Sequence, residues 1–192
     1  MPPKLKDLDH LAMKVRDLGK SLHFYVDLLG FQINDGRKMV SWSGRPSRHI
    51  SCTNKHHTIN LFEFRPKDGS ADLPKNHSQD NDEYGLMHFA FEVENKGIFD
   101  EWVKYLNSVS EIKIIRGPTL HSATHPEGDG TPGENRSIYI EDPDGNVVEI
   151  MCDMMRVEKN GEVDKKWHSE RILRDGYDPN KLPLPKIHNY KD

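Results

Sequence analysis

The sequence predicts an α+β fold built from two paired β-α-β-β-β modules. A phrase of eight residues, Leu8–Val15, returns in similar form as Leu86–Val93, with histidine, alanine and valine at equivalent places and an offset of 78 residues. Each copy is followed by a segment with helical periodicity and then by a run of strand-like segments, and a polar stretch separates the two sets. Alternation within each copy places its histidine and alanine on one face of a strand and larger apolar side chains on the other.

The first module is expected to cover residues 5–64. It begins with a strand at 5–15, and a helix follows at 17–29 with Asp17 as its N-cap and Gly30 as its stop. The apolar residues of this helix recur at helical spacing, and they are Leu18, Leu22, Tyr25 and Leu29. Four strands are expected after the helix, the first two flanking the hairpin pair Asp35-Gly36, at residues 31–33, 39–42, 49–53 and 58–64.

The second module is expected to cover residues 86–152, and the polar residues 65–85 connect the two modules. The repeated phrase opens it, a helix follows near 96–109, and strands are expected at 111–116, 136–141 and 146–152. A long loop at 117–134 carries His121 and His125. Because such a long loop inside a compact domain is usually functional or disordered, it is a candidate part of a site.

Composition narrows the class of protein. The net charge is −4 over 192 residues with both signs interspersed, which gives no electrostatic case for nucleic acid or an anionic membrane. No signal-peptide pattern and no membrane-spanning apolar run is present, and Cys52 and Cys152 lack a CxxC partner, so we expect a cytoplasmic protein with reduced cysteines. Residues 1–152 are expected to form one domain. The charged tail at 153–192 is either a partly ordered extension or an arm that covers the site or grips a second subunit.

The repeat predicts a metal centre. If the last strands of the modules correspond as the first strands do, one central face carries His10, Asn60, His88 and Glu149. Two neutral imidazoles and one carboxylate form the facial triad that leaves positions open on an octahedral iron. Asn60 is a poor ligand, and its rival Glu63 lies an odd number of residues away, so it should point to the opposite face. A lone strand histidine is more often a satisfied core residue, but the duplicated arrangement favours a site.

Three further motifs accompany the triad, and together they resemble a known family. They are Cys52–Ile59, which contains His56 and His57; Gly117–His125; and Ser137–Glu149, in which Tyr139 precedes Glu149 by ten residues through an Asp-Pro-Asp-Gly turn. Residues 5–152 resemble the vicinal oxygen chelate superfamily, whose members pair such modules into a cupped mixed sheet around a metal. The three motifs resemble those of its type I extradiol ring-cleaving dioxygenases, and of catechol 2,3-dioxygenase in particular.

The resemblance implies an Fe(II)-dependent dioxygenase of aromatic catabolism, in which Mn(II) is a second choice of metal. It implies His10, His88 and Glu149 as metal ligands and His57, His125 and Tyr139 as catalytic residues, with His57 as acid–base and the other two near substrate oxygens. The substrates implied are a catechol-type aromatic diol and O₂, and the product is a muconic semialdehyde. The protein is expected to be a homo-oligomer.

Two departures from the family pattern stand out. Twelve residues separate His125 from Ile138, more than in the family, as if residues 126–133 held an insertion. The chain also has one two-module domain, which resembles the small single-domain members.

Two alternative functions of the same fold stay open. One is a glyoxalase- or epimerase-type enzyme, which needs a fourth ligand where Asn60 stands, and the other is a drug-binding resistance protein, which can dispense with metal ligands. Purely structural interpretations also stay open, in which His56 and His57 are a solvated pair and Tyr139 only occupies a cross-strand position.

Overall fold

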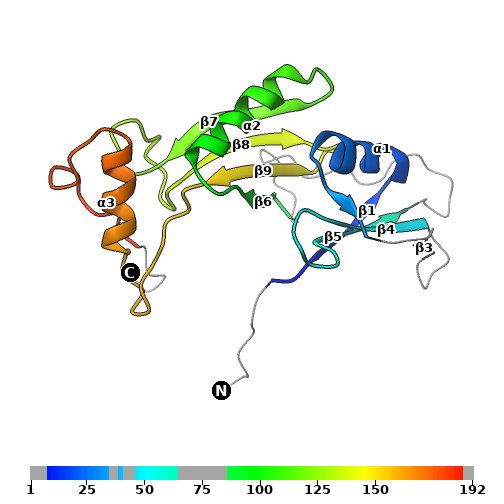
Figure 1. The fold of residues 1–192 in the computed structure, drawn as a ribbon, viewed down its shortest axis with the longest axis horizontal. Coiled ribbons are helices and arrows are strands. Elements are labelled where there is room, and N and C mark those ends of the chain that lie inside the picture. Colours follow the sequence, from blue (N-terminus) through cyan, green and yellow to red (C-terminus); the bar gives the residue numbers. More distant parts are fainter. Residues whose placement is uncertain (1–7, 35–38, 41–45, 65–85, 188–192) are drawn as a thin grey trace. The chain divides into compact units, whose positions relative to one another are not determined.

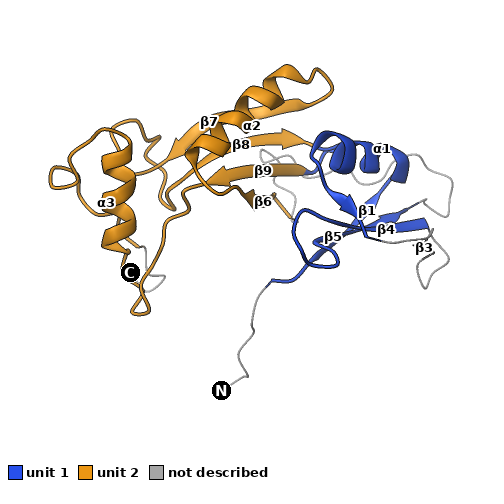
Figure 2. Ribbon diagram, viewed as in Figure 1, with its two compact units in different colours: residues 1–81, 142–146 blue, residues 82–141, 147–192 orange. Residues whose placement is uncertain are grey.

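The computed structural model describes residues 8–34, 39–40, 46–64 and 86–187. Its elements are drawn in Figure 1. The chain divides into two compact units, which Figure 2 shows in blue and orange. Unit 1 comprises residues 1–81 and 142–146, and unit 2 comprises residues 82–141 and 147–192. The expected connection at 65–85 lies outside the described residues.

Unit 1 contains a mixed sheet in which β1 and β5 are parallel and the remaining pairs are antiparallel. The strand order is β1-β5-β4-β2, and β3 also pairs with β4. The strands are β1 (Leu11–Val15), β2 (Gln32–Ile33), β3 (Met39–Val40), β4 (Pro46–Ser51) and β5 (Ile59–Glu63). One face of this sheet is buried and apolar, with Val15, Ile50, Ile59 and Leu61 fully covered. The observed β1-helix-strand order confirms the first β-α-β-β-β module.

The helix expected at 17–29 is present, but it changes its winding. Asp17 caps it as predicted, accepting a hydrogen bond of 3.0 Å from the backbone N–H of Lys20. Regular α1 (Leu18–Leu22) then gives way to the π-helical turn η1 (His23–Leu28). A π-turn is wider than an α-turn, and here the adjacent aromatic residues Phe24 and Tyr25 are both buried. The helix stops at Gly30, whose φ of +77° is the left-handed value that favours glycine.

The hairpin expected around Asp35-Gly36 is replaced by a different pairing. Among the described residues, β2 and β3 pair with the two ends of β4 and not with one another. Residues 35–38, which include the predicted turn, lie outside the described residues. The sequence pattern located the strands but not their partner, because turn chemistry is local and strand pairing is not.

Unit 2 contains the second module and an additional helix. Its sheet has the order β6-β9-β8-β7, with β6 and β9 parallel and the other pairs antiparallel. The elements are β6 (Phe89–Glu92), α2 (Lys96–Ser108), β7 (Lys113–His121), β8 (Asn135–Glu141), β9 (Val147–Cys152) and α3 (Lys165–Arg174). Asn95 caps α2, which buries Phe99 and Leu106 and contacts β7 and β9. The second β-α-β-β-β module is therefore confirmed.

The two modules are equivalent in register. In unit 1, Ala12 of β1 lies opposite Asn60 of β5, and in unit 2, Ala90 of β6 lies opposite Glu149 of β9. Each repeated histidine stands one residue before its strand, His10 before β1 and His88 before β6. The correspondence that the sequence repeat predicted thus holds at the level of individual residue pairs.

Strand β7 is longer than predicted. The sequence placed residues 117–134 in a loop, but β7 continues to His121 and pairs Thr119, Leu120 and His121 with β8. Gly and Pro at 117–118 masked this continuation, and the register does shift between Arg116 and Thr119, as expected for a bulge. The loop proper therefore begins at Ser122, and His121 belongs to the sheet.

The tail that the sequence left undecided is described through residue 187 and belongs to unit 2. Helix α3 is capped by Asp164 and buries His168, Arg171 and Ile172. Within the described part of the chain, no helix is long and apolar enough to cross a membrane.

Candidate functional site

One face of the unit 2 sheet gathers the predicted site residues of that unit. Tyr139 of β8 lies opposite Glu149 of β9, and Ala90 of β6 lies opposite Glu149 on the other side. Because side chains alternate along a strand, this row shares its face with Ser137 two residues away on β8. Apolar side chains such as Ile138, Ile140, Val148 and Ile150 occupy the other face and are buried.

Glu149 is the centre of this face, and only 5% of it is exposed. Its Oε2 lies 3.1 Å from Nε2 of His88, and its Oε1 accepts a hydrogen bond of 3.0 Å from the Tyr139 hydroxyl. The Ser137 hydroxyl also donates to Oε1. A buried carboxylate needs such partners, and here they fix both of its oxygens.

The Tyr139 hydroxyl links Glu149 to a histidine. Nε2 of His121 lies 3.0 Å from that hydroxyl, and Nδ1 of His121 lies 2.8 Å from Oδ2 of Asp129. The guanidinium of Arg116 lies over the Tyr139 ring, 5.7 Å from its centre, and contacts Asp129 at 3.3 Å. Burial raises the pKa of Tyr139, and the nearby Glu149 charge adds to this rise, while a hydrogen bond with Ser137 opposes it. This phenol therefore keeps its proton at neutral pH.

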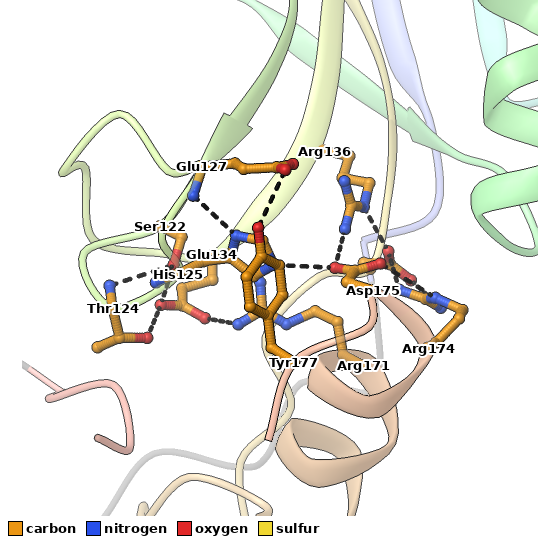
Figure 3. A network of polar contacts seen from close by, with 11 residues as sticks. Ser122, Thr124, His125, Glu127, Glu134, Arg136, Arg171, Arg174, Asp175 and Tyr177 are labelled. Carbon is orange, nitrogen blue, oxygen red and sulfur yellow. Dashed lines mark hydrogen bonds and ion pairs between the residues drawn. The ribbon is translucent and has the colours of Figure 1, made fainter. Parts of the chain in front are cut away.

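His125, which the sequence assigned to catalysis, lies in a different network (Figure 3). Its Nδ1 accepts a hydrogen bond of 3.1 Å from the backbone N–H of Glu127, and its Nε2 lies 3.1 Å from Oδ2 of Asp175. The ring of Tyr177 packs edge-on against it at 5.0 Å. His125 points toward the C-terminal segment because the chain turns after β7. In this turn the Ser122 hydroxyl accepts a hydrogen bond of 2.8 Å from the backbone N–H of His125. The structure therefore gives Tyr139 the neighbour His121 in place of His125.

The same network holds the loop at 122–134 to the C-terminal segment. Glu134 is fully buried, pairs with Arg171 of α3 and accepts a hydrogen bond of 2.8 Å from Thr124. Arg136 pairs with Asp175 and, at 3.0 Å, with Asp153. The loop is thus fixed by buried charge pairs, which explains why it is ordered despite its length.

In unit 1 the predicted residues His10 and His57 lie together. Their ring centres are 4.5 Å apart. The ring of His49, on β4, lies 4.4 Å from the ring of His57. Nδ1 of His56 is 3.0 Å from Nδ1 of His57. Burial, followed by the charges of the neighbouring histidines, lowers the pKa of His57. Nδ1 of His10 lies 3.0 Å from Oδ2 of Asp9, which leaves Nε2 of His10 as the nitrogen with a lone pair.

Asn60 and Glu63 follow the predicted alternation. Oδ1 of Asn60 is buried and has no hydrogen-bond partner among the described residues. Oε2 of Glu63 accepts a hydrogen bond of 3.3 Å from the backbone N–H of Leu18, at the start of α1. Glu63 therefore serves the helix side of the sheet, as its odd spacing from Asn60 requires.

The unit 2 residues fit a divalent metal. Nδ1 of His88 is buried without a hydrogen-bond partner among the described residues, and its Nε2 touches the Glu149 carboxylate. Imidazole nitrogen with carboxylate oxygen is the donor set that suits Fe(II) and Mn(II). No three His, Cys, Asp or Glu side chains of the described ranges converge closely enough to hold an ion. Since His10 belongs to unit 1 and His88 and Glu149 to unit 2, the complete triad stays a prediction.

Sequence reasoning did not assign roles to His121, Asp129, Arg116 and His49. For His121 a signal was available: it lies at an even spacing from Thr119, so extending the strand through Gly117 would have put it on the face that carries Tyr139. Asp129 had no signal, because a loop carboxylate has no periodicity to place it.

Comparison with known proteins identifies the family. Residues 7–150 match the family described as the Glyoxalase/Bleomycin resistance protein/Dioxygenase superfamily. Virulence protein STM3117 of Salmonella typhimurium is 30% identical over 149 residues, which span 74% of this chain and 81% of that protein. Biphenyl-2,3-diol 1,2-dioxygenase 3 of Rhodococcus globerulus is 25% identical over 185 residues, 96% of this chain and 82% of that one.

Other relatives carry other activities in their names. Metallothiol transferase FosB of Staphylococcus saprophyticus is 23% identical, covering 76% of each chain. Among solved structures, SMU.1112c is 25% identical with a TM-score of 0.55, covering 77% of this chain and 99% of that one. The relatives thus share a fold and span several functions, so the fold alone does not determine the reaction.

Proposed function

Since this chain belongs to the glyoxalase/bleomycin resistance/dioxygenase superfamily, we propose that it is an extradiol dioxygenase. Its substrates are a catechol-type aromatic diol and O₂, and its product is a muconic semialdehyde-type compound. The metal ligands in this proposal are His10, His88 and Glu149, and the metal is Fe(II), with Mn(II) as the alternative. Members of this superfamily commonly use a divalent metal, and three protein ligands would leave room on it for both substrates.

One observation supports this choice above the others. Glu149, the proposed ligand, lies 3.0 Å from the Tyr139 hydroxyl, which in turn lies 3.0 Å from Nε2 of His121. A phenol and an imidazole beside a ligand carboxylate are the groups that bind and deprotonate a diol next to a metal. A drug-binding protein of the same fold has no need of this sequence of contacts.

Each side chain has a definite task. When bound at His10, His88 and Glu149, a metal would acidify the diol hydroxyls and hold both reactants. His121 takes the place that the resemblance gave to His125, as the imidazole that hydrogen-bonds a substrate oxygen. Tyr139 donates a proton to the same region and stabilises developing negative charge. His57 exchanges protons with the substrate, while His125 stabilises the loop that follows β7.

The test is anaerobic reconstitution with ferrous iron, followed by air and a panel of catechols. We expect a yellow ring-opened product and the uptake of one O₂ per diol. No product and no oxygen uptake from protein with iron bound would overturn the proposal. Turnover of a thiol-conjugating or isomerase substrate by the same preparation would favour the functions suggested by the FosB-type relatives and by glyoxalases.

A further inference from the structure

We propose that Asp129 is a positioning residue, whose carboxylate holds His121 in the tautomer with the proton on Nδ1 and Nε2 facing Tyr139. The inference rests on the proposed function, because that function makes His121 the imidazole that contacts a substrate oxygen. It also supplies a role for residues 126–133, which follow His125 in the loop after β7.

The Asp129 carboxylate is aimed at the back of the His121 ring. Oδ2 of Asp129 lies 2.8 Å from Nδ1 of His121, and the His121 side chain is 8% exposed while that of Asp129 is 27% exposed. The other carboxylate oxygen, Oδ1, accepts a hydrogen bond of 2.9 Å from the backbone N–H of Thr131. Arg116 contacts Oδ2 at 3.3 Å. Both oxygens are therefore engaged, and the carboxylate has little freedom to leave the imidazole.

The backbone around Asp129 is tied to the strand that carries His121. Asp129 N–H donates to the Leu120 carbonyl at 3.0 Å, and Gly130 N–H donates to the Ser122 carbonyl at 2.9 Å. The loop can pass this close to the strand because residue 128 is glycine. A Cβ there would lie 2.3 Å from the Ser122 carbonyl oxygen. The loop thus folds back along the end of β7 and places the Asp129 carboxylate against His121.

Proton counting shows what the contact achieves. A carboxylate only accepts hydrogen bonds, so Nδ1 of His121 must carry a proton toward Asp129. Nε2 then carries a lone pair, which can accept a proton from a bound diol, or from the Tyr139 hydroxyl when that hydroxyl turns from Glu149 to His121. Without Asp129, a neutral imidazole favours the other tautomer, in which Nε2–H donates to the Tyr139 oxygen while the Tyr139 hydroxyl donates to Glu149.

Asp129 is ionised under the conditions in which this matters. Burial raises its pKa, but hydrogen bonds from Thr131 and His121 outweigh burial and lower the pKa below its usual value. The acceptor is therefore charged at neutral pH, which strengthens its hydrogen bond to the imidazole.

The experiment uses the full chain labelled with ¹⁵N-histidine and free of metal. Long-range ¹H–¹⁵N spectra, assigned with His121→Gln, should show His121 with its proton on Nδ1. In Asp129→Asn, whose amide can donate as well as accept, the Nε2–H form should appear. In Asp129→Glu the Nδ1–H signal should be largely restored. Arg116→Gln is the matched control, because it removes the other side-chain partner of Asp129 and should leave the tautomer unchanged.

Turnover provides the second readout. Asp129→Asn should lower kcat by about 10- to 100-fold, as loss of an outer-shell partner does elsewhere, with a smaller change in KM. A wild-type His121 protonated on Nε2, or an unchanged tautomer and kcat in Asp129→Asn, would overturn the inference. If the wild-type protein cleaves no diol while the Nδ1–H tautomer depends on Asp129, the proposed function fails and the positioning of His121 stands.

Discussion

His121 and His125 are separated by only three residues, yet they contact entirely different neighbours. His121 ends β7 and reaches the Tyr139 hydroxyl on the sheet, whereas His125 follows a turn and reaches Asp175 in the C-terminal segment. The sequence motif contains both histidines and cannot say which one continues the strand. Hydrogen bonding to Ser122, which sets the turn, decides the matter.

Substitution of each histidine by glutamine separates catalysis from stability. We expect His121→Gln to lower kcat by about 10²- to 10⁴-fold, the range for loss of an acid–base group, with little change in melting temperature. His125→Gln should instead lower the melting temperature and leave the kcat of the folded fraction within a few-fold of wild type, because its contacts are structural. Steady-state kinetics beside thermal unfolding would measure both effects. The reverse pattern would return the catalytic role to His125.

At the scale of elements, sequence periodicity predicted what local spacing determines. The repeat, the α2 helix and the parallel register of Ala12 with Asn60 and of Ala90 with Glu149 all follow from patterns of two or 3.6 residues. The π-turn at η1, the pairing of β2 and β3 with β4, and the extension of β7 depend on distant partners. The same limit applies to the candidate site, where the histidines and Glu149 had a periodic signal and Asp129 had none.

The contact of α3 with the loop at 122–134 depends on one buried ion pair. Arg171 and Glu134 are 1% and 0% exposed, so removal of one partner leaves an uncompensated charge. We expect Arg171→Met to destabilise the protein by about 3–5 kcal/mol, and the double variant Arg171→Met with Glu134→Gln to recover part of this loss. Urea unfolding gives the free energies. Lys166→Met, in the exposed pair with Glu170 on the same helix, is the control and should cost about 0.5 kcal/mol or less. Equal losses of unfolding free energy in Arg171→Met and Lys166→Met would show that the Arg171–Glu134 pair does not behave as a buried pair.

The packing of α3 should also depend on pH. His168 is 2% exposed, and neither ring nitrogen has a hydrogen-bond partner within the described chain. Burial lowers the pKa of His168 below 6.5, and the charges of Arg171 and His125 lower it further. The charge of Glu134 opposes this shift. Burial lowers the pKa of His125 as well, although Asp175 and Glu127 oppose this while Arg171 and Arg136 reinforce it.

A depressed histidine pKa means that the unfolded chain binds more protons than the folded one. Stability is therefore complete above the unfolded pKa of about 6.5 and falls as the pH drops through it, by at most about 1.4 kcal/mol per pH unit for each histidine. Melting temperatures at pH 7.5, 6.5 and 5.5 should decrease in that order. His168→Leu, which removes a titrating group without leaving a polar atom unpaired, should reduce the slope. A slope identical to that of wild type would show that His168 does not cause it.

At the scale of the whole molecule, the proposal requires ligands from both copies of the repeat. A metal that binds only the folded chain stabilises it by about 2.7 kcal/mol at 100 times its dissociation constant. Addition of Mn(II) or anaerobic Fe(II) should therefore raise the melting temperature, and a chelator should reverse the rise. His10→Ala, in the first module, and Glu149→Gln, in the second, should each abolish it. His23→Ala is the matched control, since this exposed helix histidine pairs with Asp27 and should keep the full response. A normal response in His10→Ala would mean that the second module binds the metal alone, and that the duplicated histidine serves another purpose.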